Sequence, residues 1–250
     1  INTVHEQERC KGVPILLMGA SEGTLLAAEA ASRQPDKVSG LVLYGLLATN
    51  LRENFKYIMS DGAFLTYRWH FDTNKDGTIT KDEFEKDPHN YRAKVLRNAE
   101  FDVFDRDSDG AFSLRDMTML TKRYLDAVDN DQFEVLQAWA KTSASVAVPD
   151  KWFEDHFAHQ PIWDFLSQID IPVGCFHGAM DRSAPIAAVR ALEKKAKSAK
   201  KTKMKFVYFD DLDHTLNIAR YFAARELPAG HRAIFQFIDN CLPERDRTNR

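Results

Sequence analysis

The sequence of 250 residues has few cysteines, no long apolar run and no dominant block of charge of one sign. Its three cysteines, Cys10, Cys175 and Cys241, are odd in number and widely spaced, which argues against a disulfide framework and against a zinc site. No apolar stretch approaches the roughly 18 residues that a transmembrane helix requires, so we expect no membrane span. A net charge of -3, with one short lysine-rich stretch at 194–203 that fits a solvated helix end, gives no reason to expect nucleic acid as a partner.

The composition indicates a globular protein but not its compartment. Hydrophobic residues make up 44% of the chain and charged residues 28%, which is enough apolar material for a full core. The first residue is Ile1 and not methionine, so the sequence leaves open whether a signal peptide or another leading segment precedes it.

The pentapeptide Gly-Ala-Ser-Glu-Gly at 19–23 is the most informative motif near the start of the chain. It follows a continuous apolar run and precedes an Ala- and Leu-rich segment, so we predict a doubly buried strand over 13–18, a tight turn, and a helix over 22–33. A nucleophile elbow presents its serine in this context, here Ser21, with glycines that let strand and helix pass closely. An ordinary turn that contains a serine fits the same five residues.

Three further apolar runs predict strands of a parallel sheet: 38–44, 171–177 and 205–209. Between the strands 38–44 and 171–177 the character of the sequence changes, because aromatic and charged residues alternate at helical spacing over about a hundred residues. We therefore predict an α/β core formed by 1–48 and 160–250, with a helical domain, 49–159, inserted between two strands of its sheet.

Within the inserted domain, residues 72–83 match the twelve-residue loop of an EF-hand calcium site at each diagnostic position. Gly77 at position 6 permits the sharp turn, and Glu83 at position 12 would coordinate through both carboxylate oxygens. The oxygen ligands, including the carbonyl of Thr78, would come from Asp72, Asn74, Asp76, Thr78, Thr80 and Glu83. A solvated polar loop is the alternative interpretation.

A second loop, 105–116, repeats the pattern with one departure. Its ligands would be Asp105, Asp107, Asp109, the carbonyl of Ala111, Ser113 and Asp116. An aspartate at position 12 reaches less far than a glutamate and tends to coordinate through one oxygen, so we expect this site to bind Ca²⁺ more weakly than the first, or to tolerate Mg²⁺.

Together the two loops resemble a paired EF-hand lobe. They begin 33 residues apart, and position 8 of each is apolar, with Ile79 and Phe112 placed to pair across a short ribbon. The resemblance implies two calcium ions and a core made of five apolar residues: Phe71, Phe84, Phe101, Phe104 and Met117.

Two polar residues follow the last two predicted strands of the core. Asp181 lies just beyond the third strand and His214 follows the fourth, and parallel α/β sheets place functional groups at such carboxyl ends. Asp210, Asp211 and Asp213 are nearer to His214 along the chain. Neighbours within one loop rarely point back at their own histidine, so Asp181 is the favoured acid.

Ser21, Asp181 and His214 occur in the order of the Ser-Asp-His triad of the α/β-hydrolase superfamily, and 177–181 (His-Gly-x-x-Asp) resembles the acid loop of that family. The resemblance implies an α/β-hydrolase-type sheet whose strands lie side by side in chain order, with the elbow strand at one margin. Helical caps are common in the family after the strand that follows the elbow. Here the EF-hand pair occupies that position.

The resemblance also implies a function and a mechanism. His214 would remove the proton of Ser21 as the hydroxyl attacks an acyl carbonyl, Asp181 would orient the imidazole, and the backbone N–H of Glu22 would be one oxyanion donor. This describes a serine hydrolase acting on an ester or related acyl bond of a small molecule. A peptidase of the same fold and a non-catalytic calcium-binding or interaction protein on a hydrolase scaffold are the alternatives.

Members of the family carry further strands and an oxyanion loop before the elbow, whereas only twelve residues precede the elbow strand here. The resemblance therefore implies a missing N-terminal segment of the same protein, with a degenerate relative as the alternative. Weak calcium sites would slightly favour a compartment outside the cytosol.

Overall fold

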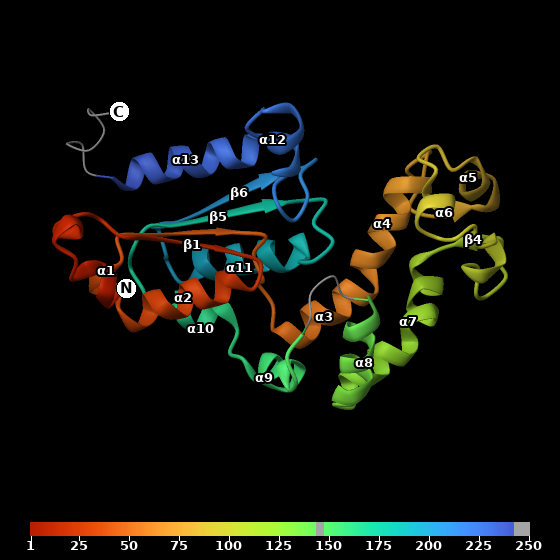
Figure 1. The fold of residues 1–250 in the computed structure, drawn as a ribbon, viewed down its shortest axis with the longest axis horizontal. Helices are drawn as coiled ribbons and strands as arrows, with labels where there is room; N and C mark the ends of the chain where they lie inside the picture. The colour runs from red at the N-terminus through yellow and green to blue at the C-terminus, as the bar shows by residue number, and fades with distance from the viewer. Residues whose placement is uncertain (144–147, 243–250) are drawn as a thin grey trace. The chain divides into compact units, whose positions relative to one another are not determined.

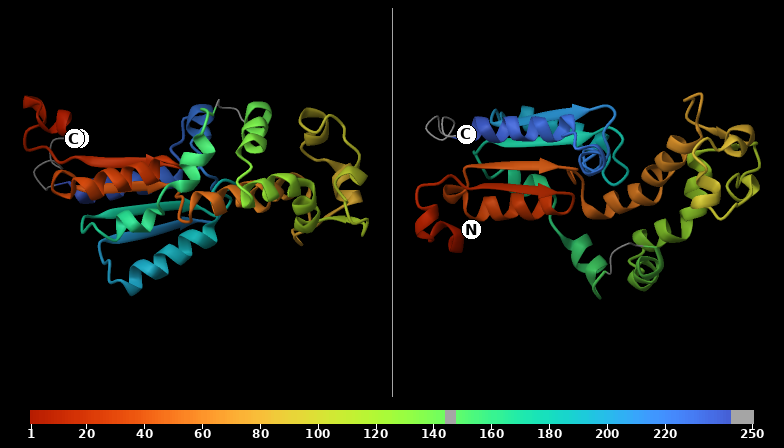
Figure 2. Two further views of the ribbon diagram at one scale, coloured as in Figure 1. Left: turned by 90° about the horizontal axis from the view of Figure 1, so that it is seen from below. Right: turned by 45° about the horizontal axis from the view of Figure 1, so that its top comes forward.

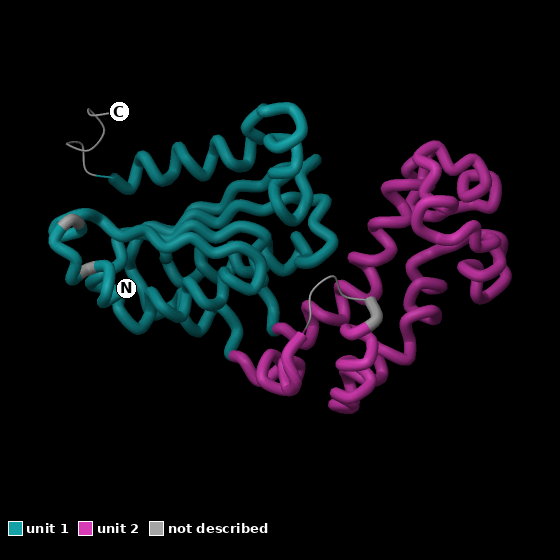
Figure 3. Tube along the Cα trace, in the orientation of Figure 1, with its two compact units in different colours: residues 1–50, 160–250 teal, residues 51–159 magenta. Residues whose placement is uncertain are grey.

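The structure of this chain is a computed structural model that describes residues 1–143 and 148–242 (Figure 1). The chain divides into two compact units (Figure 3). We call residues 1–50 with 160–250 the sheet unit, and residues 51–159 the loop unit. The expected core and inserted domain also extend over 243–250 and 144–147, which lie outside the described residues.

The sheet unit is built on four parallel strands in the order β1-β2-β5-β6. The strands are β1 (Leu16–Ala20), β2 (Gly40–Tyr44), β5 (Val173–Gly178) and β6 (Met204–Phe209). The register places Leu16 opposite Gly40, and Leu41 opposite Val173. The strands thus lie side by side in chain order with the elbow strand at the margin, which confirms the order expected from the sequence.

Helices cover both faces of this sheet (Figure 1, Figure 2). On one face Phe237 of α13 (Ala229–Cys241) packs in a cluster with Val42 and Phe176. The opposite face carries α2 (Gly23–Arg33) and α11 (Ile186–Ser198). The remaining helical segments of the unit are α1 (Asn2–His5), η1 (Glu8–Cys10), η2 (Pro35–Lys37), α10 (Ile162–Leu166) and α12 (Ala219–Ala224). Covering both faces explains why the central strands are continuously apolar.

The first strand differs from its prediction in position and burial. It runs over Leu16–Ala20 and not 13–18, and it lies at the edge of the sheet, paired with β2 on one side. The side chain of Met18 is 59% exposed, whereas Leu41 and Leu43 of β2 are fully buried. An apolar run therefore marked the strand, but it did not reveal the strand's place in the sheet.

The loop unit is helical apart from one short ribbon. Its helices are α3 (Leu51–Met59), α4 (Asp61–Phe71), α5 (Lys81–Lys86), α6 (Tyr91–Lys94), α7 (Leu114–Asp129), α8 (Phe133–Ser143) and α9 (Trp152–Ala158), with a 3₁₀ turn at Phe101–Val103. In the ribbon, β3 (Ile79–Thr80) runs antiparallel to β4 (Ala111–Phe112), and Ile79 pairs with Phe112. The pairing predicted for these two residues is confirmed.

Two aromatic-rich cores hold the loop unit together. One contains Phe64, Ile79 and Phe112 with all five residues expected from the sequence: Phe71, Phe84, Phe101, Phe104 and Met117. The other joins α3, α7, α8 and α9 through residues such as Phe55 and Phe153. In the described part of the chain, every helix is too short or too polar to cross a lipid bilayer.

Candidate active site and candidate cation-binding loops

Ser21 occupies a strained turn between β1 and α2. Its backbone φ is 54°, in the left-handed region that residues other than glycine rarely adopt. The turn is held on both sides: the N–H of Ser21 donates to the carbonyl of Tyr44 (3.1 Å), and its own carbonyl accepts from the N–H (2.9 Å) and the hydroxyl (2.6 Å) of Thr24. Strain that neighbouring contacts maintain is typical of functional turns.

The two glycines of the pentapeptide do not contribute equally. A Cβ at Gly19 would overlap the carbonyl of Gly23 and lie 2.9 Å from the Cα of Thr24, whereas a Cβ at Gly23 would meet no atom within 4 Å. The prediction that both glycines make room for the crossing of strand and helix is therefore wrong for Gly23. Close approach of β1 to α2 requires glycine at position 19.

Asp181, which is buried, pairs with His214, which is partly exposed. The imidazole Nδ1 of His214 lies 2.9 Å and 2.8 Å from the two carboxylate oxygens of Asp181, which is 1% exposed. Asp181 Oδ1 also accepts the N–H groups of Ser183 (2.7 Å) and Ala184 (2.9 Å), so its carboxylate has a fixed orientation. With a proton on Nδ1 donated to Asp181, the basic nitrogen of His214 is Nε2.

The segment that follows β2 brings Ser21 and His214 to one place. Tyr44 accepts the N–H of Ser21, and a Cβ on the next residue, Gly45, would lie 2.7 Å from the carbonyl oxygen of His214 and 3.0 Å from its Nδ1. Gly45 has a φ of 55°. Within the described residues no hydrogen bond joins Ser21 Oγ to His214. This arrangement is compatible with a catalytic pair, because catalytic hydrogen bonds often form fully only when substrate binds.

The other residues considered for this site lie close to the triad candidates. Glu22 is the N-cap residue of α2, so its backbone N–H belongs to the start of a helix. Asp213, the nearest alternative acid in the sequence, accepts the N–H groups of Thr215 and Asn217 at 2.8 Å and thus caps its own turn. The acid that contacts the imidazole of His214 is Asp181.

Sequence reasoning gave no role to His177, a fully buried residue beside Asp181. Its Nδ1 accepts the N–H of Leu46 (3.3 Å), and its Nε2 lies 3.2 Å from the carbonyl of Ala184. Burial lowers the pKa of this imidazole, against the nearby charge of Asp181, which raises it. The hydrogen-bond pattern assigns a neutral ring with its proton on Nε2. A histidine that ends an apolar strand was the available signal.

In the loop unit, the position-1 aspartates close the two acidic loops with the same hydrogen bonds. Asp72 accepts the N–H groups of Asp76 (3.1 Å) and Gly77 (3.1 Å), and Gly77 has a φ of 98°. The second loop repeats these bonds at 3.1 and 3.0 Å, with Asp105, Asp109 and Gly110 as the equivalent residues. Glycine at position 6 therefore provides the turn that sequence reasoning assigned to it.

The position-12 carboxylates, Glu83 and Asp116, are buried and face their own loops. Glu83 accepts the N–H groups of Thr73 (3.0 Å), Asn74 (3.3 Å) and Thr80 (3.0 Å), and Asp116 accepts the three equivalent N–H groups of the second loop. Burial acts to raise the pKa of both carboxyls, but these hydrogen bonds outweigh it, and each pKa lies below its ordinary value. Both groups are therefore held as carboxylates.

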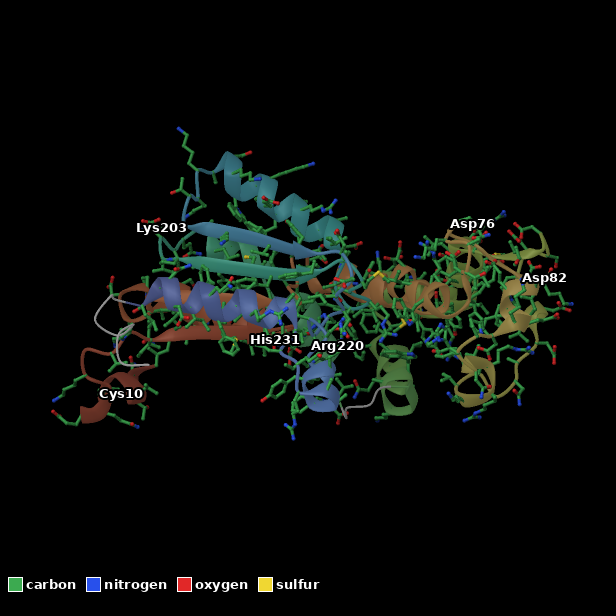
Figure 4. The ribbon with its side chains drawn as sticks, turned by 90° about the horizontal axis from the view of Figure 1, so that it is seen from above. Cys10, Asp76, Asp82, Lys203, Arg220 and His231 are labelled. Atoms are coloured by element: carbon green, nitrogen blue, oxygen red, sulfur yellow. The ribbon has the colours of Figure 1, made fainter. Side chains whose placement is uncertain are left out.

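The remaining predicted ligands lie around these loops. Asp76 is exposed (Figure 4) and accepts the N–H and the hydroxyl of Thr78 and an amide N–H of Asn74. Thr80 is the N-cap residue of α5 and forms a capping box with Glu83. In the second loop Ser113 donates its hydroxyl to Asp116, and Ala111 lies in β4.

The second loop gathers three carboxylates in a small volume. Ligand oxygens of Asp105, Asp107 and Asp109 all lie within 4.8 Å of one another. Both oxygens of Asp107 are buried and have no hydrogen-bond partner among the described residues, although Arg115 Nη1 lies 2.9 Å from one of them as an ion pair. Carboxylates this close repel each other unless a cation lies between them, and hard divalent cations prefer oxygen ligands. The residues therefore fit Ca²⁺ or Mg²⁺.

No protein-family model and no curated protein matches the chain. Similar solved structures include a monoacylglycerol lipase from Paleococcus ferrophilus, with 16% identity and a TM-score of 0.39 over 92% of this chain and 70% of the lipase. An esterase from Pyrococcus furiosus has 11% identity and a TM-score of 0.46 over 96% of this chain and 58% of the esterase. A thermostable carboxyl esterase from Bacillus coagulans is 15% identical, with a TM-score of 0.47 and coverage of 94% and 67%. Because these TM-scores are below 0.5, the function proposed below depends on the residues of this chain alone.

Proposed function

We propose that the chain is a serine hydrolase of the α/β-hydrolase type that cleaves an ester or related acyl bond of a small molecule. Ser21 is the nucleophile, His214 the general base and Asp181 the acid that orients it. The observation that carries the proposal is the contact between buried Asp181 and partly exposed His214, beside the segment that also accepts the N–H of Ser21.

The proposed chemistry follows from the hydrogen-bond pattern. Donation from His214 Nδ1 to Asp181 leaves Nε2 free to take the proton of the Ser21 hydroxyl during attack on an acyl carbonyl. The negative charge of Asp181 then stabilises the imidazolium that forms. The N–H of Glu22, at the start of α2, would donate to the oxyanion of the tetrahedral intermediate.

A fluorophosphonate probe, which labels activated serines, tests this assignment. We expect the wild-type protein to be labelled, Ser21→Ala to lose labelling and ester turnover by orders of magnitude, and Ser32→Ala to behave as wild type. Ser32 is a suitable control because it lies on α2 and donates to a backbone carbonyl. Labelling that persists in Ser21→Ala would overturn the assignment.

The substrates used with the probe separate the alternatives. Turnover of p-nitrophenyl esters without turnover of peptide anilides favours the esterase over the peptidase of the same fold. Calcium binding by a protein that neither reacts with the probe nor turns over either substrate favours the non-catalytic alternative.

We also propose that the loop unit, the expected cap, binds two calcium ions. The first would be held by Asp72, Asn74, Asp76, Thr78, Thr80 and Glu83, and the second by Asp105, Asp107, Asp109, Ala111, Ser113 and Asp116. The support is the carboxylate cluster of the second loop and the shared hydrogen bonds of the two loops. Such ions would stabilise the loop unit by binding its folded form.

Calorimetric titration with Ca²⁺ tests this second proposal. We expect two sites, with tighter binding at 72–83 than at 105–116, because Glu83 can coordinate through two oxygens. Glu83→Gln should abolish the tighter site and Asp116→Asn the weaker one. Asp82→Asn is the matched control, since Asp82 is exposed on α5 and is not a predicted ligand (Figure 4). Absence of calcium heat, or the reverse ranking, would refute the proposal.

A further inference from the structure

His177 lies near the end of β5, next to the proposed triad but out of contact with solvent. It is 0% exposed, so no substrate can reach it. Its Nε2 is 3.6 Å from Asp181 Oδ2, which is too long for a hydrogen bond, while its Nε2 proton is within reach of the Ala184 carbonyl at 3.2 Å. Any effect of His177 on catalysis must therefore pass through the residues that it holds.

The first group that His177 holds is the acid loop. Ala184 is bonded twice: its carbonyl accepts from His177 and its N–H donates to Asp181 Oδ1 at 2.9 Å. The N–H of Ser183 donates to the same oxygen at 2.7 Å. The loop 181–184 is thus folded onto the carboxylate, and His177 anchors it to the end of β5.

The second group is the segment that follows β2. Leu46 donates its N–H to His177 Nδ1, across 131 positions of sequence. The preceding residue, Gly45, lies against the imidazole of His214, and the following residue, Leu47, donates its N–H to Thr24 Oγ1 at 3.4 Å. The His214 ring contacts the acid loop through Asp181 and the segment after β2 through Gly45. His177 is hydrogen-bonded to both of these segments and therefore joins them.

We infer that His177 is a positioning residue of the proposed triad: it fixes the separation between Asp181 and Gly45, and so the orientation of His214. This inference rests on the proposed hydrolase function. An apolar side chain in its place would leave the Leu46 N–H and the Ala184 carbonyl buried without their partner. The acid loop and the segment that contains Gly45 could then shift, and the His214 ring would lose its fixed orientation.

Steady-state kinetics of matched variants test the inference. We expect His177→Leu to lower kcat for a p-nitrophenyl ester by about 10- to 100-fold, the range typical of residues that orient functional groups, with KM changed less than twofold. His177→Gln should recover part of kcat, because its amide N–H can still donate to the Ala184 carbonyl. Cys175→Ala is the control, since Cys175 is equally buried two residues earlier on the same face of β5.

The control separates positioning from general packing. A purely structural role would lower the urea midpoint of His177→Leu while leaving its kcat within twofold of Cys175→Ala, and that result would overturn the inference. If circular dichroism shows that His177→Leu does not fold, His177→Gln is compared with Cys175→Ala instead. In that case, values of kcat and KM in His177→Gln equal to those of Cys175→Ala would overturn the inference.

A spectroscopic measurement separates failure of this inference from failure of the proposed function. The NMR signal of the His214 Nδ1 proton, which is held against Asp181, should shift or disappear in the His177 variants and stay unchanged in Cys175→Ala. This holds even if the wild-type protein neither turns over esters nor reacts with the probe, in which case the proposed function alone fails. An unchanged signal in the His177 variants would overturn the inference in an active protein.

Discussion

The oxygens of Asp181 in the sheet unit and of Asp107 in the loop unit are satisfied differently, whereas Glu83 and Asp116 of the loop unit accept backbone N–H groups as Asp181 does. Asp181 of the sheet unit accepts from the chain's own donors, His214, Ser183 and Ala184. In the loop unit, Asp107 has two buried oxygens with no hydrogen-bond partner among the described residues; one of them forms an ion pair with Arg115, and two other aspartates lie beside it. A proposed catalytic site has to be organised before its substrate arrives, whereas a proposed cation site needs oxygens that the protein leaves available.

Both units contain left-handed residues other than glycine. In the sheet unit, hydrogen bonds to Tyr44 and Thr24 hold Ser21 in this conformation at a cost in conformational energy. In the acidic loops, Lys75 (φ 62°) and Ser108 (φ 60°) are left-handed as well, and only at position 6 does a glycine, Gly77 or Gly110, take a positive φ without a Cβ penalty. A left-handed residue alone therefore does not distinguish the proposed catalytic turn from the proposed ion-binding loops.

The largest expected effect comes from the buried acid. Asp181→Asn should lower kcat about 10⁴-fold, because an amide cannot hold the His214 tautomer that the mechanism needs. Calcium binding in the loop unit should stay unchanged. Ester kinetics and a calcium titration of the same variant make the comparison between the two units direct.

Asp213→Asn is the control for this change, because Asp213 is the sequence neighbour of His214 but caps its own turn. We expect its kcat to stay within about tenfold of wild type. An equal loss in Asp213→Asn and Asp181→Asn would contradict the assignment of Asp181.

An intermediate effect is expected from the glycines of the elbow. Gly19→Ala should lower the free energy of unfolding by about 3 kcal/mol, because its methyl group would overlap the carbonyl of Gly23 and the close approach of β1 to α2 would be lost. Gly23→Ala should be neutral or stabilise by up to about 1 kcal/mol, since nothing lies near its Cβ and alanine favours the helix. Urea unfolding of the two variants measures both effects.

The two glycine variants also test whether the units are independent. Calcium affinity should be the same in Gly19→Ala and Gly23→Ala as in wild type at low urea. Equal stability of the two variants would show that the crossing of β1 and α2 tolerates a methyl group, contrary to the geometry.

Features that follow from spacing or from the two family resemblances could be predicted. The spacing of the two acidic loops predicted the Ile79–Phe112 pair, and the resemblances implied the strand order and the core around Phe71. The proximity of Asp181 and His214 could be anticipated because both follow parallel strands.

Features that depend on contacts between distant segments could not be predicted from the sequence. The exposure of Met18 depends on which strand lies at the edge, and an apolar run is the same at an edge and in the centre. Gly45 looks like any turn glycine until the His214 ring is placed against it. The bond from Leu46 to His177 spans 131 positions and has no local signature.

The smallest expected effect is a difference in the pH range over which each unit loses stability. In the sheet unit, burial lowers the pKa of His177 below its ordinary value of 6.5, so the unfolded chain binds more protons than the folded one below that pH. This contribution is present above about pH 6.5 and is lost as the pH falls towards the folded pKa. In the loop unit, the lowered pKa of Glu83 gives a contribution that is present above about pH 4.5 and is lost at lower pH.

Urea midpoints measured in chelator between about pH 7 and pH 3.5 separate the two contributions. His177→Gln should flatten the pH dependence below about pH 6.5, because the variant has no imidazole to titrate, whereas Glu83→Gln should flatten it only below about pH 4.5. Burial also lowers the pKa of His231, so His177→Gln should remove part of the upper slope and leave the rest. Parallel curves for wild type and both variants would mean that neither group is more acidic in the folded protein than in the unfolded chain.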